Sequence, residues 1–329
     1  MAKKKGCLGC SLPVAIGIIV IALAIVIVGA LAGPLGEQFG VTGLPGWMTL
    51  DLPEPRLPAD VVFHIGGFGV TNTLLASWIT MLFLILVALV VARKPKLLPS
   101  RAQSMVESIL GYIHDLCTST AGEKDGRKFF PLVATIFLFV LFNALLALIP
   151  GFGSIEAHTA EGEVELLRGA NTDFNTPLAL ALITFFTVEF MGFKRLGLGY
   201  MKKFLTWGDF GRAVGKIFKG KFDAMALLSG FIMGVVGLLE LVSELIRVVS
   251  LTFRLFGNML AGEIVLLVIA YVIPYFVPLV FYGLEAFFAV IQAMIFGILT
   301  IVYISLAVSG HDSGEHHKAT EPIKVVENI

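Results

Sequence analysis

The stretch Ser250-Leu-Thr-Phe-Arg254-Leu-Phe-Gly-Asn258-Met-Leu-Ala-Gly262-Glu263 places an arginine, an asparagine and a glutamate inside a long apolar run. A charged side chain at membrane depth costs from about 3 to more than about 10 kcal/mol. Arg254 stays protonated at any ordinary pH, so it cannot avoid this cost by losing its charge. A buried arginine of this kind predicts a functional site, and we expect the rest of the chain to hold it at one depth.

The composition of the chain agrees with a membrane protein. Of its 329 residues, 57% are hydrophobic and only 15% are charged, whereas soluble domains carry about 25% charged residues. Several apolar runs reach the roughly 18 residues that a membrane-spanning helix needs. We therefore predict an all-α polytopic membrane protein with about five transmembrane helices, plus an extra N-terminal hydrophobic helix and a cytoplasmic amphipathic helix.

The N-terminal region is a hydrophobic helix whose fate the sequence leaves open. Lys3-Lys4-Lys5 precedes an apolar run that ends at Ala32. The run is either a signal peptide or a retained anchor, and its length favours the anchor. The regions that follow are an external segment rich in proline and glycine, a helical domain and a polar tail. With the N-terminal region they cover, in order, residues 1–33, 34–72, 73–310 and 311–329.

Clusters of lysine and arginine predict the orientation in the membrane. Basic residues follow the span at 73–92, and eight more lie within 194–221. Such clusters stay on the cytoplasmic side. The loop between the spans at 129–149 and 177–193 carries five acidic residues opposed only by Arg168, which places it outside. We expect a multi-pass membrane protein with its C-terminus in the cytoplasm.

Three segments differ from an ordinary span. Apolar residues recur at helical spacing over 101–118, with polar residues between them, which predicts an amphipathic helix at the cytoplasmic membrane surface. Residues 226–273 contain no proline, and a single helix there would be about 70 Å long against a hydrocarbon core of about 30 Å. The segment is either two helices broken near Gly257 or Gly262, or one strongly tilted helix. The last run, 279–308, also exceeds an upright span.

Helical phasing places six polar residues on one side of the segment around Arg254. The others lie within about 40° of the arginine around the helix axis. This polar stripe should face protein or a water-filled cavity. Glu263 points about 180° away from Arg254, while Glu285 and Gln292 share one face of the last run. The stripe consists of Glu240, Ser243, Arg247, Ser250, Arg254 and Asn258.

The motif Arg-Leu-Phe-Gly-Asn-Met-x-Ala-Gly-Glu resembles subunit a of F-type ATP synthase. A serine four residues before the arginine and a later glutamine followed by Leu-Thr-Ile-Val-Tyr belong to the same resemblance. It is specific over residues 226–308, looser from residue 73 onward, and does not cover residues 1–60. It implies a stator subunit with two offset half-channels that carry protons, or sodium ions, to and from the carboxylates of a c-subunit ring. Ion flow is thereby coupled to rotation and ATP synthesis.

The same resemblance implies partner subunits for the chain and a tilt of its two C-terminal helices. The two long C-terminal helices would lie steeply tilted against the c-ring, and the subunit b peripheral stalk and the rest of the ATP synthase would be further partners. The arginine would attract the c-subunit carboxylate, make it release its ion, and block a direct leak between the half-channels. An opposite charge nearby favours the ionised carboxylate, whereas burial against lipid favours the neutral form.

Nine residues match positions that the family uses for ion translocation. One is the essential arginine, two are amides beside it, two belong to the cytoplasmic access path, two are acids of the external half-channel, and two lie at its mouth. In that order they are Arg254; Asn258 and Gln292; Glu240 and Ser250; Glu263 and Glu285; and Asp173 and Asn175.

Glu285 departs from the family pattern, because well-known bacterial members have a histidine at this position. Glu263 and Glu285 would then form a pair of carboxylates at the external entrance. Two close carboxylates do not easily ionise together, which suits a shared proton relay.

Other functional classes fit the sequence less well. The chain has no Gly-x-x-x-x-Gly-Lys-Ser/Thr phosphate loop, so we expect it to hold no nucleotide site of its own. Cys7-x-x-Cys10 has no second pair, and we predict no metal or other cofactor and no nucleic-acid partner. The alternative is a stand-alone transporter or channel with Arg254 as an anion site. Such carriers often contain internal repeats, which this sequence does not show.

Overall fold

A computed structural model describes most of the chain, and the described residues divide into two compact units. Residues 201–223 hold most of the basic residues of the predicted cytoplasmic loop, and residues 310–329 include the predicted polar tail. Both ranges lie outside the described residues. Those residues are 12–40, 58–93, 101–149, 151–159, 162–200 and 224–309. The first unit comprises Met1–Ser104, Thr135–Leu178 and Thr252–Phe296, and the second comprises Met105–Ala134, Ala179–Leu251 and Gly297–Ile329.

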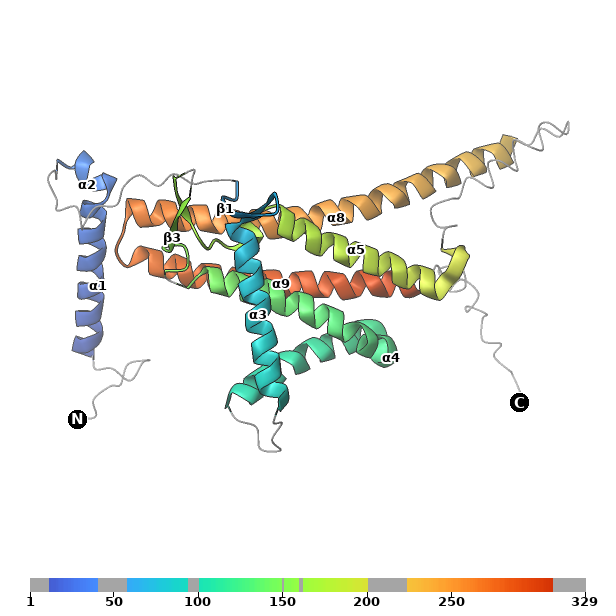
Figure 1. The fold of residues 1–329 in the computed structure, drawn as a ribbon, viewed down its shortest axis with the longest axis horizontal. Coiled ribbons are helices and arrows are strands. Elements are labelled where there is room, and N and C mark those ends of the chain that lie inside the picture. The colour runs from blue at the N-terminus through green and yellow to red at the C-terminus, as the bar shows by residue number, and fades with distance from the viewer. Residues whose placement is uncertain are drawn as a thin grey trace, which may run out of the picture. The chain divides into compact units, whose positions relative to one another are not determined.

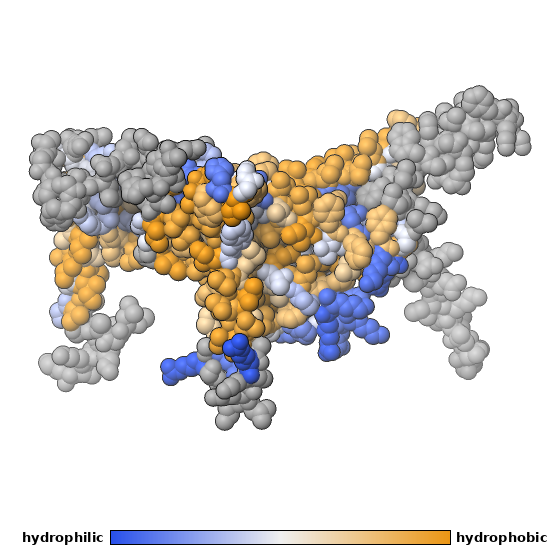
Figure 2. Space-filling view, viewed as in Figure 1, coloured by the Kyte–Doolittle hydropathy of each residue, from blue (hydrophilic) through white to orange (hydrophobic). Residues whose placement is uncertain are grey.

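Helices make up almost all of the described structure, which confirms the prediction of an all-α polytopic membrane protein (Figure 1). Six helices among the described residues are long and apolar enough to cross a membrane. They are α1 (Leu12–Ala32), α3 (Asn72–Arg93), α4 (Arg101–Ala147), α5 (Asn175–Leu196), α8 (Ala224–Val272) and α9 (Val277–Ser309). The shorter helices are α2 (Pro34–Gln38), η1 (Ala170–Thr172) and η2 (Gly197–Gly199). Figure 2 shows apolar side chains along the visible faces of α1 and α3, as expected for helices that contact lipid.

Two short antiparallel hairpins accompany the helices. Strand β1 (Val61–Ile65) pairs with β2 (Phe68–Thr71), and β3 (Glu156–Thr159) pairs with β4 (Gly162–Glu165). The end of β4 is tied to the start of α3, because the side-chain amide of Asn72 donates a hydrogen bond of 3.2 Å to the backbone carbonyl of Glu165. This bond positions the loop that follows β4, and that loop supplies a residue to the site described below.

Helix α4 combines the predicted amphipathic helix and the span that follows it. The two parts meet at Gly122, where φ is 78° and ψ is 164°. These angles lie in a region that only glycine adopts without strain, so the helix breaks there. The predicted separation between a surface helix near 101–118 and a span near 129–149 therefore corresponds to a break within one continuous segment.

Helix α8 resolves the alternative that the sequence left open, because it runs unbroken through both Gly257 and Gly262. It contains 49 residues, and a helix of that length measures about 74 Å. Since the hydrocarbon core is about 30 Å thick, α8 cannot cross it upright and has to lie inclined. Pro274 and Phe276, whose φ is 66°, lie in the short turn that leads into α9. The shortness of this turn makes α8 and α9 antiparallel neighbours.

A buried polar contact joins α3 to the second part of α4 in the first unit. The side-chain amide of Asn143 donates a hydrogen bond of 3.2 Å to the hydroxyl of Thr80, which itself donates to the carbonyl of Ala76 at 2.9 Å. Hydrogen bonds between membrane helices contribute about 1 kcal/mol each. They also fix the rotation of one helix against the other, and here they hold α3 and α4 beside the loop after β4.

Candidate functional site

The arginine singled out by the sequence lies beside a hydrogen bond between α8 and α9. Arg254 and Asn258 lie one turn apart on α8, and the side-chain amide of Asn258 donates a hydrogen bond of 2.8 Å to the side-chain oxygen of Gln292 on α9. Gln292 is buried, and its own amide nitrogen has no partner among the described residues. The structure thus brings the two predicted amides together one turn from the arginine. The amide nitrogen of Gln292 is still available there as a hydrogen-bond donor.

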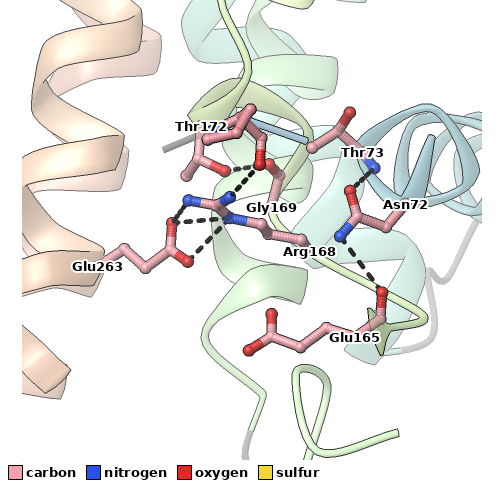
Figure 3. Close-up of polar contacts among 8 residues, drawn as sticks. Asn72, Thr73, Glu165, Arg168, Gly169, Thr172 and Glu263 are labelled. Carbon is pink, nitrogen blue, oxygen red and sulfur yellow. Dashed lines mark hydrogen bonds and ion pairs between the residues drawn. The ribbon is translucent and has the colours of Figure 1, made fainter. Parts of the chain in front are cut away.

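Glu263 lies in an ion pair that the sequence did not predict. Arg168, from the loop after β4, holds the Glu263 carboxylate with both Nε and one terminal nitrogen, at 2.9 Å and 3.1 Å (Figure 3). Its other terminal nitrogen donates to the backbone carbonyl of Pro58 at 3.3 Å. Arg168 is only 6% exposed. Two parallel bonds from a planar guanidinium fix both the position and the orientation of a carboxylate.

Glu285 approaches the same region from α9, where it packs against Gly262 of α8. A Cβ atom at position 262 would overlap the Glu285 carboxyl group. Glycine at this position therefore gives the carboxyl group its place against the α8 backbone. Among the described residues, no hydrogen bond or ion pair to the Glu285 carboxyl group is present, in contrast to Glu263.

A cavity of about 290 Å³ connects these groups. Glu165, Arg168, Glu263, Tyr282 and Glu285 are the titratable or charged residues that line it. A second, largely apolar cavity of about 220 Å³ lies further along the same pair of helices and contains Gly262, Glu285 and Asn258 in its wall. Because Glu285 lines both cavities, it links the pocket around Glu263 with the pocket that reaches Asn258.

Asp173 and Asn175 form a separate cluster at the start of α5. Asp173 accepts hydrogen bonds from the Thr73 hydroxyl at 3.1 Å and from the backbone and side-chain nitrogens of Asn175, both at 3.2 Å. The structure therefore brings these two predicted residues together, beside the first turn of α3. The cavity around Glu263 is lined by the neighbouring residue Thr172 rather than by either of them.

In the second unit, Arg247 of the polar stripe forms an ion pair with an acid that lies outside the stripe. Arg247 donates a hydrogen bond of 2.6 Å to the carboxylate of Glu244 and stacks at 4.1 Å on the ring of Tyr303. Glu244 is buried. Of the residues predicted for the cytoplasmic path, Glu240 is half-buried and Ser250 is exposed on the same helix.

A second intramembrane acid of this unit also has a partner. The Tyr200 hydroxyl donates to the carboxylate of Glu189 on α5 at 3.3 Å. Burial raises the pKa of Tyr200 above its ordinary value, and the negative charge of Glu189 acts in the same direction. Tyr200 therefore stays protonated and remains a hydrogen-bond donor to Glu189 at any physiological pH.

Sequence reasoning missed Arg168 and Glu244, although each left a signal. Arg168 is the one cation in an otherwise acidic loop, and a lone opposite charge of that kind suggests a specific partner. Glu244 precedes Arg247 by three residues, a spacing that brings two side chains together on a helix. Among the described residues, no group of three or more histidine, cysteine, aspartate or glutamate side chains could hold a metal ion.

The fold and the site together define a helical membrane protein that keeps charged and amide side chains within its spans. Comparison with known proteins narrows this class. The model of the family described as ATP synthase A chain matches residues 74–305, so the chain belongs to this family.

Curated relatives agree with that assignment. ATP synthase subunit a of Sulfurihydrogenibium sp. (strain YO3AOP1) is 36% identical over 218 residues, which cover 66% of this chain and 87% of the relative. ATP synthase subunit a of Moorella thermoacetica (strain ATCC 39073 / JCM 9320) is 30% identical over 251 residues, or 76% of this chain and 96% of the relative. ATP synthase subunit a 1 of Pelobacter propionicus (strain DSM 2379 / NBRC 103807 / OttBd1) is 34% identical over 228 residues, or 69% and 83%.

Proposed function

We propose that the chain is the ion-translocating stator subunit a of an F-type ATP synthase. In this function it lines two offset half-channels and exchanges protons with the carboxylates of a rotating c-ring. Family membership supports the assignment. The observation that carries it within the structure is the placement of Arg254 one turn from the hydrogen bond between Asn258 and Gln292.

The arginine acts through its permanent charge. A c-ring carboxylate that arrives beside Arg254 is stabilised in its ionised form and releases its proton, whereas a carboxylate that faces lipid is driven to the neutral form. The cation also repels a proton that would cross directly from one half-channel to the other. The amides of Asn258 and Gln292 orient the arriving carboxylate without exchanging protons themselves.

The external half-channel corresponds to the two cavities along α8 and α9. Protons enter the cavity lined by Glu263 and Glu285 and leave it through the second cavity toward Asn258. Asp173 and Asn175 belong to its mouth at the start of α5. Glu240 and Ser250 serve the cytoplasmic half-channel. A glutamate suits such a path, because its carboxylate can accept a proton and its carboxyl group can release it to a neighbouring group or water.

The same proposal covers the surroundings of the chain. The partners are the c-ring, the subunit b peripheral stalk and the remaining subunits, and the chain itself holds no nucleotide site. It lies in a bacterial plasma membrane with its C-terminus in the cytoplasm. The bacterial sources of the relatives and the six apolar helices support this location. Family membership disfavours the alternative of a stand-alone transporter that uses Arg254 to bind an anion.

The substitution Arg254→Ala tests the proposal in membranes that contain the whole complex. We expect the complex to assemble, while ATP-driven proton pumping and ATP synthesis are abolished. Arg127→Gln is the matched control, because Arg127 is exposed and its ion-pair partner among the described residues is the exposed Glu123 four residues earlier. Normal pumping in assembled Arg254→Ala complexes would refute the proposal.

A further inference from the structure

The buried arginine of the external loop has a role that the proposed function does not yet include. Arg168 is almost fully buried, and its guanidinium binds three segments that are distant in sequence: its own loop, the chain at Pro58, and α8 at Glu263 (Figure 3). An arginine that only stabilised the loop would need no carboxylate from a membrane helix. The bond to Glu263 therefore connects the loop to the ion path itself.

The two acids of the external cavity are held in different ways. Two nitrogens of Arg168 donate hydrogen bonds to the Glu263 carboxylate, at 2.9 Å and 3.1 Å. The Glu285 carboxyl group rests on the backbone at Gly262 and accepts no hydrogen bond from the described residues. A carboxylate fixed by a planar fork keeps one orientation, whereas a carboxyl group at the end of a flexible side chain can turn between the two cavities that it lines.

We propose that Arg168 is a positioning residue of the external ion path, which fixes the Glu263 carboxylate at the wall of the cavity and leaves Glu285 as its mobile proton carrier. Arg168 acts through Glu263 and does not itself exchange a proton, because a guanidinium stays protonated. The proton passes from water in the larger cavity to the Glu285 carboxylate, and from its neutral carboxyl group toward Asn258. This inference rests on the proposed function and assigns the two acids different tasks.

The surroundings of Glu263 make the arginine necessary. The charged and titratable groups that line the same cavity are Arg168, Glu165 from the end of β4, and Tyr282 and Glu285 from α9. Without Arg168, Glu263 would face two other acids and no cation among these lining residues. Its side chain would then lose the contact that fixes its direction, and the spacing between the two acids of the path would no longer be held constant.

The test uses the assembled ATP synthase and compares ATP-driven proton pumping per assembled complex, with the amount of subunit a measured by immunoblot. We expect Arg168→Gln to lower pumping by at least about tenfold, because it removes both the positive charge and the two parallel hydrogen bonds to the Glu263 carboxylate, here called the fork. Arg168→Lys keeps the charge but not the fork, so we expect a smaller loss of about threefold. Arg127→Gln is the charge-matched control and should pump like the unaltered complex.

A double-variant cycle makes the test independent of the assembly of Arg168→Gln. Arg168→Lys and Glu263→Asp each weaken the fork from one side while conserving the charge. If Arg168 acts through Glu263, the double variant should pump about as well as the weaker of the two single variants, since the same interaction is lost only once. Losses that multiply would overturn the proposal, because they would show that the two residues act independently.

The outcomes also separate this inference from the proposed function. Wild-type pumping per complex in Arg168→Gln would overturn the role of Arg168 alone. The proposed function would then stand, provided that Arg254→Ala abolishes pumping. Coupled pumping in Arg254→Ala would refute the proposed function whatever the Arg168 variants do.

Discussion

Replacing Gly262 with alanine should impair ion flux without destabilising the protein. The added methyl group would overlap the Glu285 carboxyl group, which would have to move by at least about 1 Å to reach ordinary van der Waals separation. The neighbour that has to move is the end of a flexible side chain rather than backbone. A displaced rotamer costs about 0.5–1.5 kcal/mol, while alanine in place of glycine stabilises a helix interior by about 1 kcal/mol.

These two energies nearly cancel, so the thermal midpoint of the Gly262→Ala complex should stay within a few degrees of the unaltered one. Proton transfer depends more steeply on position, because a misplacement of about 1 Å can reduce a rate by about 100-fold. We therefore expect ATP-driven pumping in inverted membrane vesicles, followed with a pH-sensitive dye, to fall by about 10-fold to 100-fold.

Gly283→Ala provides the control for this experiment. It makes the same substitution on α9, two residues from Glu285, at a position where an added Cβ meets no atom within 4 Å. We expect unchanged pumping in this variant and a slightly higher thermal midpoint, because alanine without a clash stabilises the helix interior by about 1 kcal/mol. If Gly262→Ala assembles and pumps at the rate of the Gly283→Ala control, the placement of Glu285 against the α8 backbone has no part in ion transfer.

Three further substitutions test other contacts. Gln292→Leu removes the acceptor of the Asn258 amide and should cost about 1 kcal/mol in unfolding free energy, with reduced pumping; an unchanged unfolding curve in detergent would argue against this bond. Glu244→Gln leaves the largely buried Arg247 without its charged partner and should cost about 3 kcal/mol, seen as a lower thermal midpoint. Gly122→Ala forces a side chain into backbone angles that only glycine favours, so it should cost about 1–3 kcal/mol, and unaltered stability would contradict the break in α4.

Local patterns in the sequence predicted the membrane helices well. The spans expected at 73–92 and 177–193 correspond to α3 (Asn72–Arg93) and α5 (Asn175–Leu196), because uninterrupted apolar runs and flanking charges are both local signals. The length of 226–273 revealed that this segment could not be an upright helix, but not whether it breaks. Glycine lowers helix propensity by only about 1 kcal/mol, so packing decides, and α8 passes through both candidate glycines.

Local sequence patterns could not predict the contacts between segments that are distant in the chain. Arg168 and Glu263 are 95 residues apart, and nothing in the spacing of either one indicates the other. The overlap of Glu285 with the space above Gly262 likewise depends on how α8 and α9 pack. The hairpin of β1 and β2 could have been predicted, because Gly66-Gly67 between strand-forming residues is a frequent two-residue turn.

The unbroken course of α8 also fixes the spacing of the polar groups along it. Along a helix axis, Glu240 and Glu263 are separated by about 35 Å, with Arg254 about 14 Å from Glu263. α8 thus holds Arg254 and Glu263 at a fixed distance along its axis. Inserting a single residue between Arg254 and Glu263 would turn Glu263 by about 100° around the axis while lengthening the gap by only about 1.5 Å. Tolerance to insertions in this short interval should therefore be far lower than in the loops of the same chain.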